Sequence, residues 1–163
     1  MHKLQKLEVH LKIALYQPDI AGNVGTILRL SACMGVPCAI IEPCGFPFSD
    51  KALKRSGMDY AAAARIERFP DWEDFATTAH SNGSRIALLT SKGATSLYET
   101  RFLPGDTLLF GSESAGVPES VARQCDLRIR IPMQPEFRSL NVAVSAGIAL
   151  AEALRQTRQL PLE

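Results

Sequence analysis

Short runs of apolar residues recur along the chain, and each is followed by a polar or glycine-rich segment. In "VHLKIALYQ", residues 9–17, every second residue from Val9 to Leu15 is aliphatic, which is the spacing of a β-strand. Apolar runs of similar length predict further strands in "CAIIEP" (38–43), "ARIERF" (64–69), "RIALLTSKG" (85–93), "DTLLFG" (106–111) and "DLRIRIPM" (126–133).

Helical spacing separates these strands. It predicts helices in "TILRLSACMG" (26–35), which ends at Gly35, in "WEDFATTAH" (72–80) with Asp71 as its N-cap, after Pro118, and in the last third of the chain. The segment "CGFPFSDKALKRSGMDY" (44–60) is predicted to be a loop with one basic helical piece. Strand and helix therefore alternate, which predicts an α/β fold of one domain spanning residues 1–163, with a parallel sheet and helices on both faces.

Composition limits the function classes. The chain is 46% hydrophobic and 21% charged with a net charge of +1, as in ordinary globular proteins, so any nucleic-acid surface would be a local patch. It has no apolar run of membrane-spanning length, and its start does not resemble a secretory signal. The three histidines are scattered and no cysteine pair has C-x-x-C spacing, so we expect no metal and a reducing, cytoplasmic location.

In a parallel sheet, ligands bind at the carboxyl ends of the strands. The loops of interest are therefore 17–25, 90–94, 111–117 and 132–141. Gly22 and Gly25 flank Asn23 in a predicted turn, where glycines would let backbone amides approach an anion; the alternative is a plain turn followed by a solvated Arg29. Gly111 would let a flat ligand lie against bare backbone beside Glu113, although the loop could equally be a hydrophilic turn.

The last of these loops leads into a long helix rich in small residues. Pro132 and Pro135 stiffen the loop, and Ser139 is a good helix cap. Asn141 is then expected inside the first turn, where asparagine is a poor helix former, so a purely structural role does not explain it.

Together, three motifs in this order resemble the SPOUT class of methyltransferases, and within it the TrmH-like RNA ribose 2'-O-methyltransferases. They are Asn23-x-Gly25-x-x-x-Arg29, "FGSESAGVP" (110–118) and "IPM…RSLNVAVSAGIALAEALRQ" (131–156), and the resemblance extends from Ile13 to Gln156. The stretches "YQPDIAGNVGTILRL", "IIEPCGF" and "LKRSGMDY" are most similar to the members that methylate the wobble nucleotide of tRNA.

The resemblance implies a fold with a deep trefoil knot at its carboxyl end and no separate RNA-binding domain. It also implies S-adenosylmethionine as cofactor. The substrate would be the anticodon stem-loop of a tRNA, with leucine tRNA as the expected isoacceptor, methylated on the ribose of cytidine or modified uridine 34. The alternatives are another tRNA position or rRNA, or a cofactor- and RNA-binding dimer without turnover.

The resemblance also assigns residues. The catalytic residues would be Asn23, Arg29, Glu113, Ser139 and Asn141, and the cofactor would contact Leu89, Thr90, Gly111, Ile131, Met133, Ser139 and Leu140. In related sequences, the arginine that matches Arg29 is assigned the role of activating the ribose hydroxyl. Because a free guanidinium stays protonated, holding a phosphate or polarising the hydroxyl is an alternative role.

Two further expectations follow from the resemblance. Ala115 stands where related sequences often carry an arginine, which would alter the contact with RNA. A homodimer is implied, and the last helix, apolar on several sides, would lie in its interface with the helix 23–34; the alternative is that this helix is buried within its own subunit.

Overall fold

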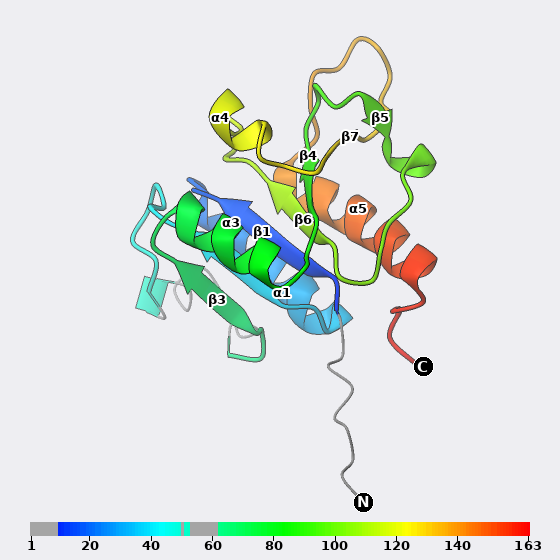
Figure 1. Ribbon diagram of the computed structural model, residues 1–163. Coiled ribbons are helices and arrows are strands. Elements are labelled where there is room, and N and C mark those ends of the chain that lie inside the picture. The colour runs from blue at the N-terminus through cyan, green and yellow to red at the C-terminus, as the bar shows by residue number, and fades with distance from the viewer. Residues whose placement is uncertain (1–9, 50, 53–61) are drawn as a thin grey trace, which may run out of the picture.

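The computed structural model describes residues 10–49, 51–52 and 62–163. In that part of the chain, seven parallel strands form one sheet in the order β3-β2-β1-β6-β4-β7-β5 (Figure 1). The strands are β1 (Lys12–Tyr16), β2 (Cys38–Ile41), β3 (Ile66–Phe69), β4 (Ile86–Leu89), β5 (Thr95–Ser96), β6 (Thr107–Phe110) and β7 (Leu127–Arg130). The parallel α/β fold predicted from the alternation is confirmed, and β5 is an addition that the pattern did not predict.

Helices cover both faces of this sheet, as predicted. They are α1 (Ala21–Met34), α3 (Trp72–Ser81), the single-turn α4 (Glu119–Ala122) and α5 (Val142–Thr157), with a 3₁₀ turn η1 (Leu97–Glu99). The buried side chains of α1 and α5 share one hydrophobic cluster, whereas those of α3 and α4 belong to a cluster on the opposite face (Figure 1). Both faces of the central strands are therefore buried.

The first helix begins earlier than predicted. Residues 21–25 are helical, so the expected turn around Asn23 is wrong: the amides of Asn23 and Val24 already bond the carbonyl of Ile20 at 3.1 and 3.3 Å. Gly25 is buried. Burial of this helix face overrides the low helix propensity of glycine. Gly35 ends the helix in the left-handed conformation, with φ of 68°, as predicted.

The capping of the last helix also differs from the prediction. Asn141, not Ser139, is the N-cap of α5, and its Oδ1 accepts hydrogen bonds from the amides of Ala143 at 2.8 Å and Val144 at 3.2 Å. The expectation that Asn141 lies inside the first turn was therefore wrong. At the N-cap, asparagine is among the most favourable residues. By contrast, Asp71 caps α3 as predicted, accepting from the amide of Asp74 at 2.8 Å.

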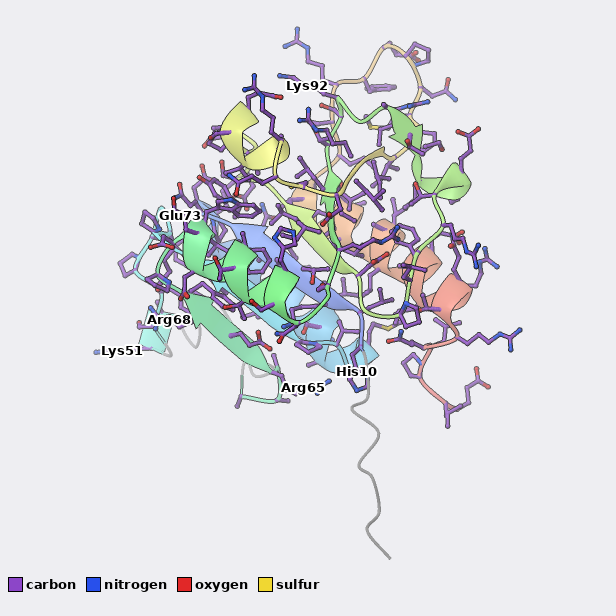
Figure 2. All side chains as sticks on the ribbon, viewed as in Figure 1. His10, Lys51, Arg65, Arg68, Glu73 and Lys92 are labelled. Carbon is purple, nitrogen blue, oxygen red and sulfur yellow. The ribbon has the colours of Figure 1, made fainter. Side chains whose placement is uncertain are left out.

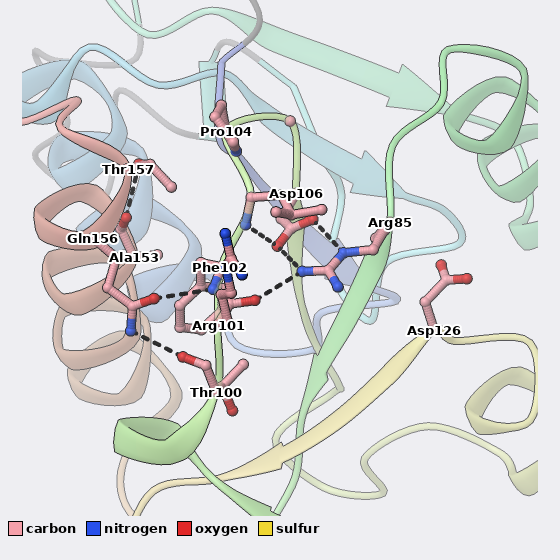
Figure 3. A network of polar contacts seen from close by, with 12 residues as sticks. Arg85, Thr100, Arg101, Phe102, Pro104, Asp106, Asp126, Ala153, Gln156 and Thr157 are labelled. Carbon is pink, nitrogen blue, oxygen red and sulfur yellow. Dashed lines mark hydrogen bonds and ion pairs between the residues drawn. The ribbon is translucent and has the colours of Figure 1, made fainter.

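Polar contacts fix the other end of α5 against the segment before β6. Gln156 accepts from the amide of Phe102 at 3.0 Å and donates to the carbonyl of Thr100 at 2.9 Å (Figure 3). Next to them, the buried carboxylate of Asp106 accepts from Arg85 through two nitrogens, at 2.9 and 2.7 Å. The two bonds of Gln156 hold α5 against the segment before β6, and the bonds between Asp106 and Arg85 fix that segment to the start of β4.

The basic helical piece expected within 44–60 falls only in part on described residues. Lys51 and Ala52 are helical, and all of "LKRSGMDY" (53–60) lies outside the described residues. Across the described ranges, no helix has both the length and the apolar character needed to cross a membrane.

Candidate active site

The carboxyl ends of four neighbouring strands, β1, β6, β4 and β7, lie side by side at one edge of the sheet. The segments that follow them enclose a cavity of about 590 Å³, together with the first turns of α1 and α5. All four loops singled out from the sequence contribute to it or to its supporting contacts. The cavity lining includes these predicted residues: Asn23, Leu89, Thr90, Gly111, Glu113, Ile131, Met133, Ser139, Leu140 and Asn141.

The segment after β6 is a tight hairpin that forms one wall. Ser112 and Gly116 exchange two backbone hydrogen bonds, at 3.1 and 2.9 Å, and Gly116 has a φ of 65°. A Cβ on Gly111 would lie 2.5 Å from the carbonyl carbon of Gly116. Gly111 lines the cavity, and its contact with Gly116 by itself already requires glycine at this position; the flat ligand lying against its backbone stays a prediction.

A second wall is the turn after β4, which is fastened to β7. The amide of Thr90 donates to the carbonyl of Ile129 at 2.8 Å, and a Cβ on Gly93 would lie 2.4 Å from the carbonyl carbon of Ile129. The guanidinium of Arg130 donates to the carbonyls of Gly93 at 3.2 Å and Ala94 at 2.7 Å. The turn carries Lys92, which lines the cavity and stands near the top of the molecule in Figure 2.

A chain of side-chain hydrogen bonds joins three of the predicted residues. The Asn141 Nδ2 donates to Asn23 Oδ1 at 3.0 Å, and the Asn23 Nδ2 donates to Glu113 Oε1 at 3.2 Å. The direction of every bond is determined, because Asn141 Oδ1 must accept from the amides at the start of α5. The two asparagine amides can therefore adopt only one orientation while the chain is intact.

Asp19, which the sequence analysis missed, continues this chain. The amide of Asp19 donates to Glu113 Oε2 and the amide of Glu113 donates to Asp19 Oδ1, both at 3.1 Å, and the hydroxyl of Ser114 donates to Asp19 Oδ2. The pKa of Asp19 falls to about 2, because Glu113 and Ser114 hydrogen-bond its carboxylate. The pKa of Glu113 is raised, first by burial and then by its hydrogen bond with Asp19. The two pKa values are thus shifted in opposite directions, downwards for Asp19 and upwards for Glu113.

Arg29 is the one predicted site residue that does not line the cavity of its own chain. It lies exposed on α1, six residues after Asn23. At roughly 100° per residue, six residues turn the helix by about 240°, so the two side chains leave α1 in different directions. The sequence spacing alone did not reveal this separation.

The lining suits an organic ligand with one flat apolar part and several polar groups. Leu88, Leu89, Ile131, Met133 and Leu140 give apolar surface, and backbone and asparagine groups lie at its edges. The volume lies within the range of about 300–1,000 Å³ that is typical of small-molecule sites. Among the described residues, no group of three or more His, Cys, Asp or Glu side chains could hold a metal ion.

Comparison with known proteins places this fold and site in a class. The chain matches the SpoU rRNA Methylase family over residues 10–151 and belongs to that family, which confirms the resemblance inferred from the three motifs. A tRNA (cytidine(34)-2'-O)-methyltransferase from Beijerinckia indica subsp. indica is 49% identical over 148 residues, covering 91% of this chain and 92% of that protein.

Solved structures agree with this placement. One described as "Structural insights into the 2-OH methylation of C/U34 on tRNA" has a TM-score of 0.84 and 41% identity, covering 91% of this chain and 97% of the other. The SpoU methyltransferase AviRb from Streptomyces viridochromogenes, in complex with the cofactor AdoMet, has a TM-score of 0.79 and 25% identity. It covers 91% of this chain and 58% of AviRb.

Proposed function

We propose that this protein is an S-adenosylmethionine-dependent tRNA 2'-O-methyltransferase that modifies the ribose of nucleotide 34, a cytidine or modified uridine. The similarity to the Beijerinckia enzyme carries the proposal, because it is 49% identical over nine-tenths of both chains. The cavity supports it, because the residues that the motifs assign to cofactor and ribose, apart from Arg29, line one space.

The cavity fits the cofactor in size and chemistry. The apolar side chains of Leu89, Ile131 and Leu140 would contact the adenine ring. The backbone after β4 and β6, which is fixed by hydrogen bonds, would hydrogen-bond the polar edges of the ring. When bound, S-adenosylmethionine supplies an electrophilic methyl group on a sulfonium sulfur. Because that donor is already reactive, the main task left to the protein is alignment of the attacking hydroxyl with it.

The polar chain is suited to this alignment. Asn23 and Asn141 are held in a single orientation at the rim of the cavity, and Ser139 lies two residues before Asn141. We propose that Glu113, Ser139 and the two asparagines position the ribose and the polar end of the cofactor. Rigid placement of this kind is worth far more than a flexible contact, since a displacement of about 1 Å can cost roughly 100-fold in rate.

Basic residues at the cavity could receive the RNA backbone. Lys92 and Arg128 line it, with Arg128 also donating to Glu119 at 3.1 Å. Ala115, at the tip of the β6 hairpin, is exposed at the same rim and offers no charge. We propose that Lys92 contacts a phosphate of the anticodon stem-loop, and that Ala115 leaves this grip weaker than an arginine would.

A homodimer would explain the position of Arg29. Much of α5 is buried within its own subunit, at Ala146, Ala149 and Leu150 among others, but Val144 is 50% exposed and Ile20 is 49% exposed near the cavity. We propose that this apolar surface and α1 form the dimer interface, and that Arg29 acts at the cavity of the partner subunit.

Subunit mixing tests this arrangement. Arg29→Ala and Asn141→Ala dimers should each be nearly inactive, whereas dimers re-formed from a mixture of the two should regain activity, because one of their sites has both residues. Mixed dimers that remain as inactive as the parents, or a monomeric mass by analytical ultracentrifugation, would exclude it.

Three expectations from the motifs remain part of the proposal. They are a trefoil knot at the carboxyl end, a single methyltransferase domain over residues 1–163, and a cytoplasmic protein that needs no metal. The strand order supports the knot, because β7 lies between β4 and β5 although it follows both in sequence. The segment 131–141 must then return from β7 across the cavity to reach α5 (Figure 1).

The reaction is tested with total tRNA from cells that lack this activity. Incubation with the protein and S-adenosylmethionine, followed by nucleoside mass spectrometry, should yield 2'-O-methylcytidine or a 2'-O-methylated uridine. Binding of the cofactor is measured separately by calorimetry. No methylation of tRNA, with methylation of rRNA in a parallel incubation, would select the alternative substrate, and failure to bind the cofactor would overturn the proposal.

A further inference from the structure

Asp19 is held in a fixed position by contacts on several sides. Two residues before it, Gln17 has a φ of 42°, a left-handed conformation that is unusual for a residue with a side chain. On another side, a Cβ on Gly45 would lie 2.6 Å from the Cβ of Asp19 and 2.9 Å from its Cα. The amide of Gly45 also donates to the carbonyl of Pro18 at 2.9 Å. Backbone strain and such close packing are typical of functional sites.

The contacts of Asp19 are directed at Glu113. The two residues lie 94 positions apart and exchange a pair of bonds, each amide donating to the carboxylate of the other residue at 3.1 Å. Ser114 adds its hydroxyl to the second oxygen of Asp19. The orientation of Glu113 therefore depends on Asp19, while Glu113 Oε1 remains directed at Asn23.

The structure assigns to Asp19 the role of a positioning residue, which acts through Glu113 to hold Asn23 and Asn141 in the orientation that the ribose requires. The assignment rests on the proposed function for the reaction itself. Asp19 is not part of the cavity lining, so its contribution is indirect. If Glu113 were free to turn, Asn23 would lose the acceptor for its Nδ2. The Asn23 amide could then rotate, and its Oδ1 would no longer be held in place to accept from Asn141.

The pKa values agree with this role. Glu113 is the largest influence on the pKa of Asp19, and the side-chain hydrogen bond with Asp19 is the second largest influence on the pKa of Glu113, after burial. Each of the two carboxyl groups faces the other. The hydroxyl of Ser114 donates to Asp19, and the side-chain amide of Asn23 donates to Glu113.

Kinetics test the role through Asp19→Ala and a double variant. Under single-turnover conditions with enzyme in excess, we expect Asp19→Ala to reduce the methylation rate by about 10- to 100-fold, with cofactor affinity within about twofold of wild type. The loss should disappear in a Glu113→Ala background, because Asp19 acts only through Glu113. A wild-type rate in Asp19→Ala, or a loss of the same size in both backgrounds, would overturn the assignment.

Two further variants distinguish the specific role of Asp19 from a general loss of folding. Gly45→Ala would displace Asp19 without removing its carboxylate, and should slow methylation without changing the rate in the Glu113→Ala background. Asp71→Ala is the matched control, because it removes another aspartate that accepts a backbone amide bond, at the start of α3 and outside the cavity lining. It should keep the wild-type rate; a loss as large as that of Asp19→Ala would show a general effect of stability and refute the specific role.

A measurement without substrate separates this inference from the proposed reaction. Carbon-13 NMR of the carboxyl groups should show Glu113 titrating above its ordinary pKa, and at lower pH in Asp19→Asn than in wild type. If wild type fails to methylate tRNA, the proposed function fails and this titration still decides whether Asp19 controls Glu113. An unchanged Glu113 midpoint in Asp19→Asn would refute the coupling.

Discussion

The side chain of Asn141 has two separable tasks, and replacing it tests both. Its Oδ1 caps α5 by accepting the amides of Ala143 and Val144, and its Nδ2 donates to Asn23 Oδ1 at 3.0 Å. Aspartate can perform the first task but not the second, since a carboxylate has no proton to donate. Asn141→Asp therefore keeps the cap and places two acceptor oxygens opposite each other at the cavity.

The expected magnitudes follow from these bonds. Aspartate caps about as well as asparagine, and its charge at a helix N-terminus adds about 0.3–1 kcal/mol. The lost bond to Asn23 costs about 0.5–1.5 kcal/mol, so the free energy of unfolding should change by less than about 1 kcal/mol. The methylation rate should fall at least about tenfold, which corresponds to about 1.4 kcal/mol in the barrier.

Asn141→Ala removes both tasks and should behave differently. Loss of the cap costs about 0.5–2 kcal/mol in addition to the lost bond, which lowers the melting temperature by about 2–4 °C per kcal/mol in a chain of this size. Thermal denaturation and single-turnover methylation are measured for both variants. Asp71→Ala serves as the control, because it removes the N-cap of α3 and should lower stability while the rate stays unchanged.

The reasoning is refuted by either of two results. One is a wild-type methylation rate in Asn141→Asp, which would show that the bond to Asn23 is dispensable. The other is a stability loss in Asn141→Asp as large as that in Asn141→Ala, which would show that the side chain does not act as a cap.

Two other replacements probe the walls and the frame of the site. Gly111→Ala places a Cβ 2.5 Å from the backbone of Gly116. Calorimetry should therefore show at least about tenfold weaker cofactor binding, and the free energy of unfolding should fall by about 1–3 kcal/mol. Gly22→Ala is the control, because nothing lies within 4 Å of its Cβ, and it should change neither quantity. Asp106→Ala removes a buried carboxylate that accepts from the half-buried Arg85 and from the amide of Leu103, and should cost about 1.5–3 kcal/mol in urea unfolding (Figure 3). No measurable loss would contradict that pairing.

The strands and the position of the cavity were predictable because their signals are local. A run such as "DTLLFG" identifies a buried strand without knowledge of its neighbours, and parallel strands place their following loops at one edge. The identity of the residues at that edge was therefore largely predicted. The N-cap role of Asn141 could also have been recognised, since asparagine ranks with serine at that position.

The remaining features depend on contacts between distant residues. The pairing of Asp19 with Glu113 spans 94 positions, and no periodic pattern reports it. The direction of Arg29 relative to Asn23 depends on whether both residues belong to α1. The helix begins before Asn23 because burial of Gly25 outweighs the low helix propensity of glycine. The short strand β5 forms only because Thr95 and Ser96 pair with β7, which lies more than thirty residues later in the chain.

The central claim is methylation of the ribose at nucleotide 34, and site-specific incorporation tests it most directly. The purified protein is incubated with methyl-labelled S-adenosylmethionine and a leucine tRNA lacking the modification, and the label is mapped by nuclease digestion and mass spectrometry. A second tRNA, identical except for a 2'-deoxynucleotide at position 34, removes the attacking hydroxyl. We predict label in the fragment containing nucleotide 34 and none in the deoxy substrate. Label at another nucleotide, or equal label in both substrates, would contradict the account.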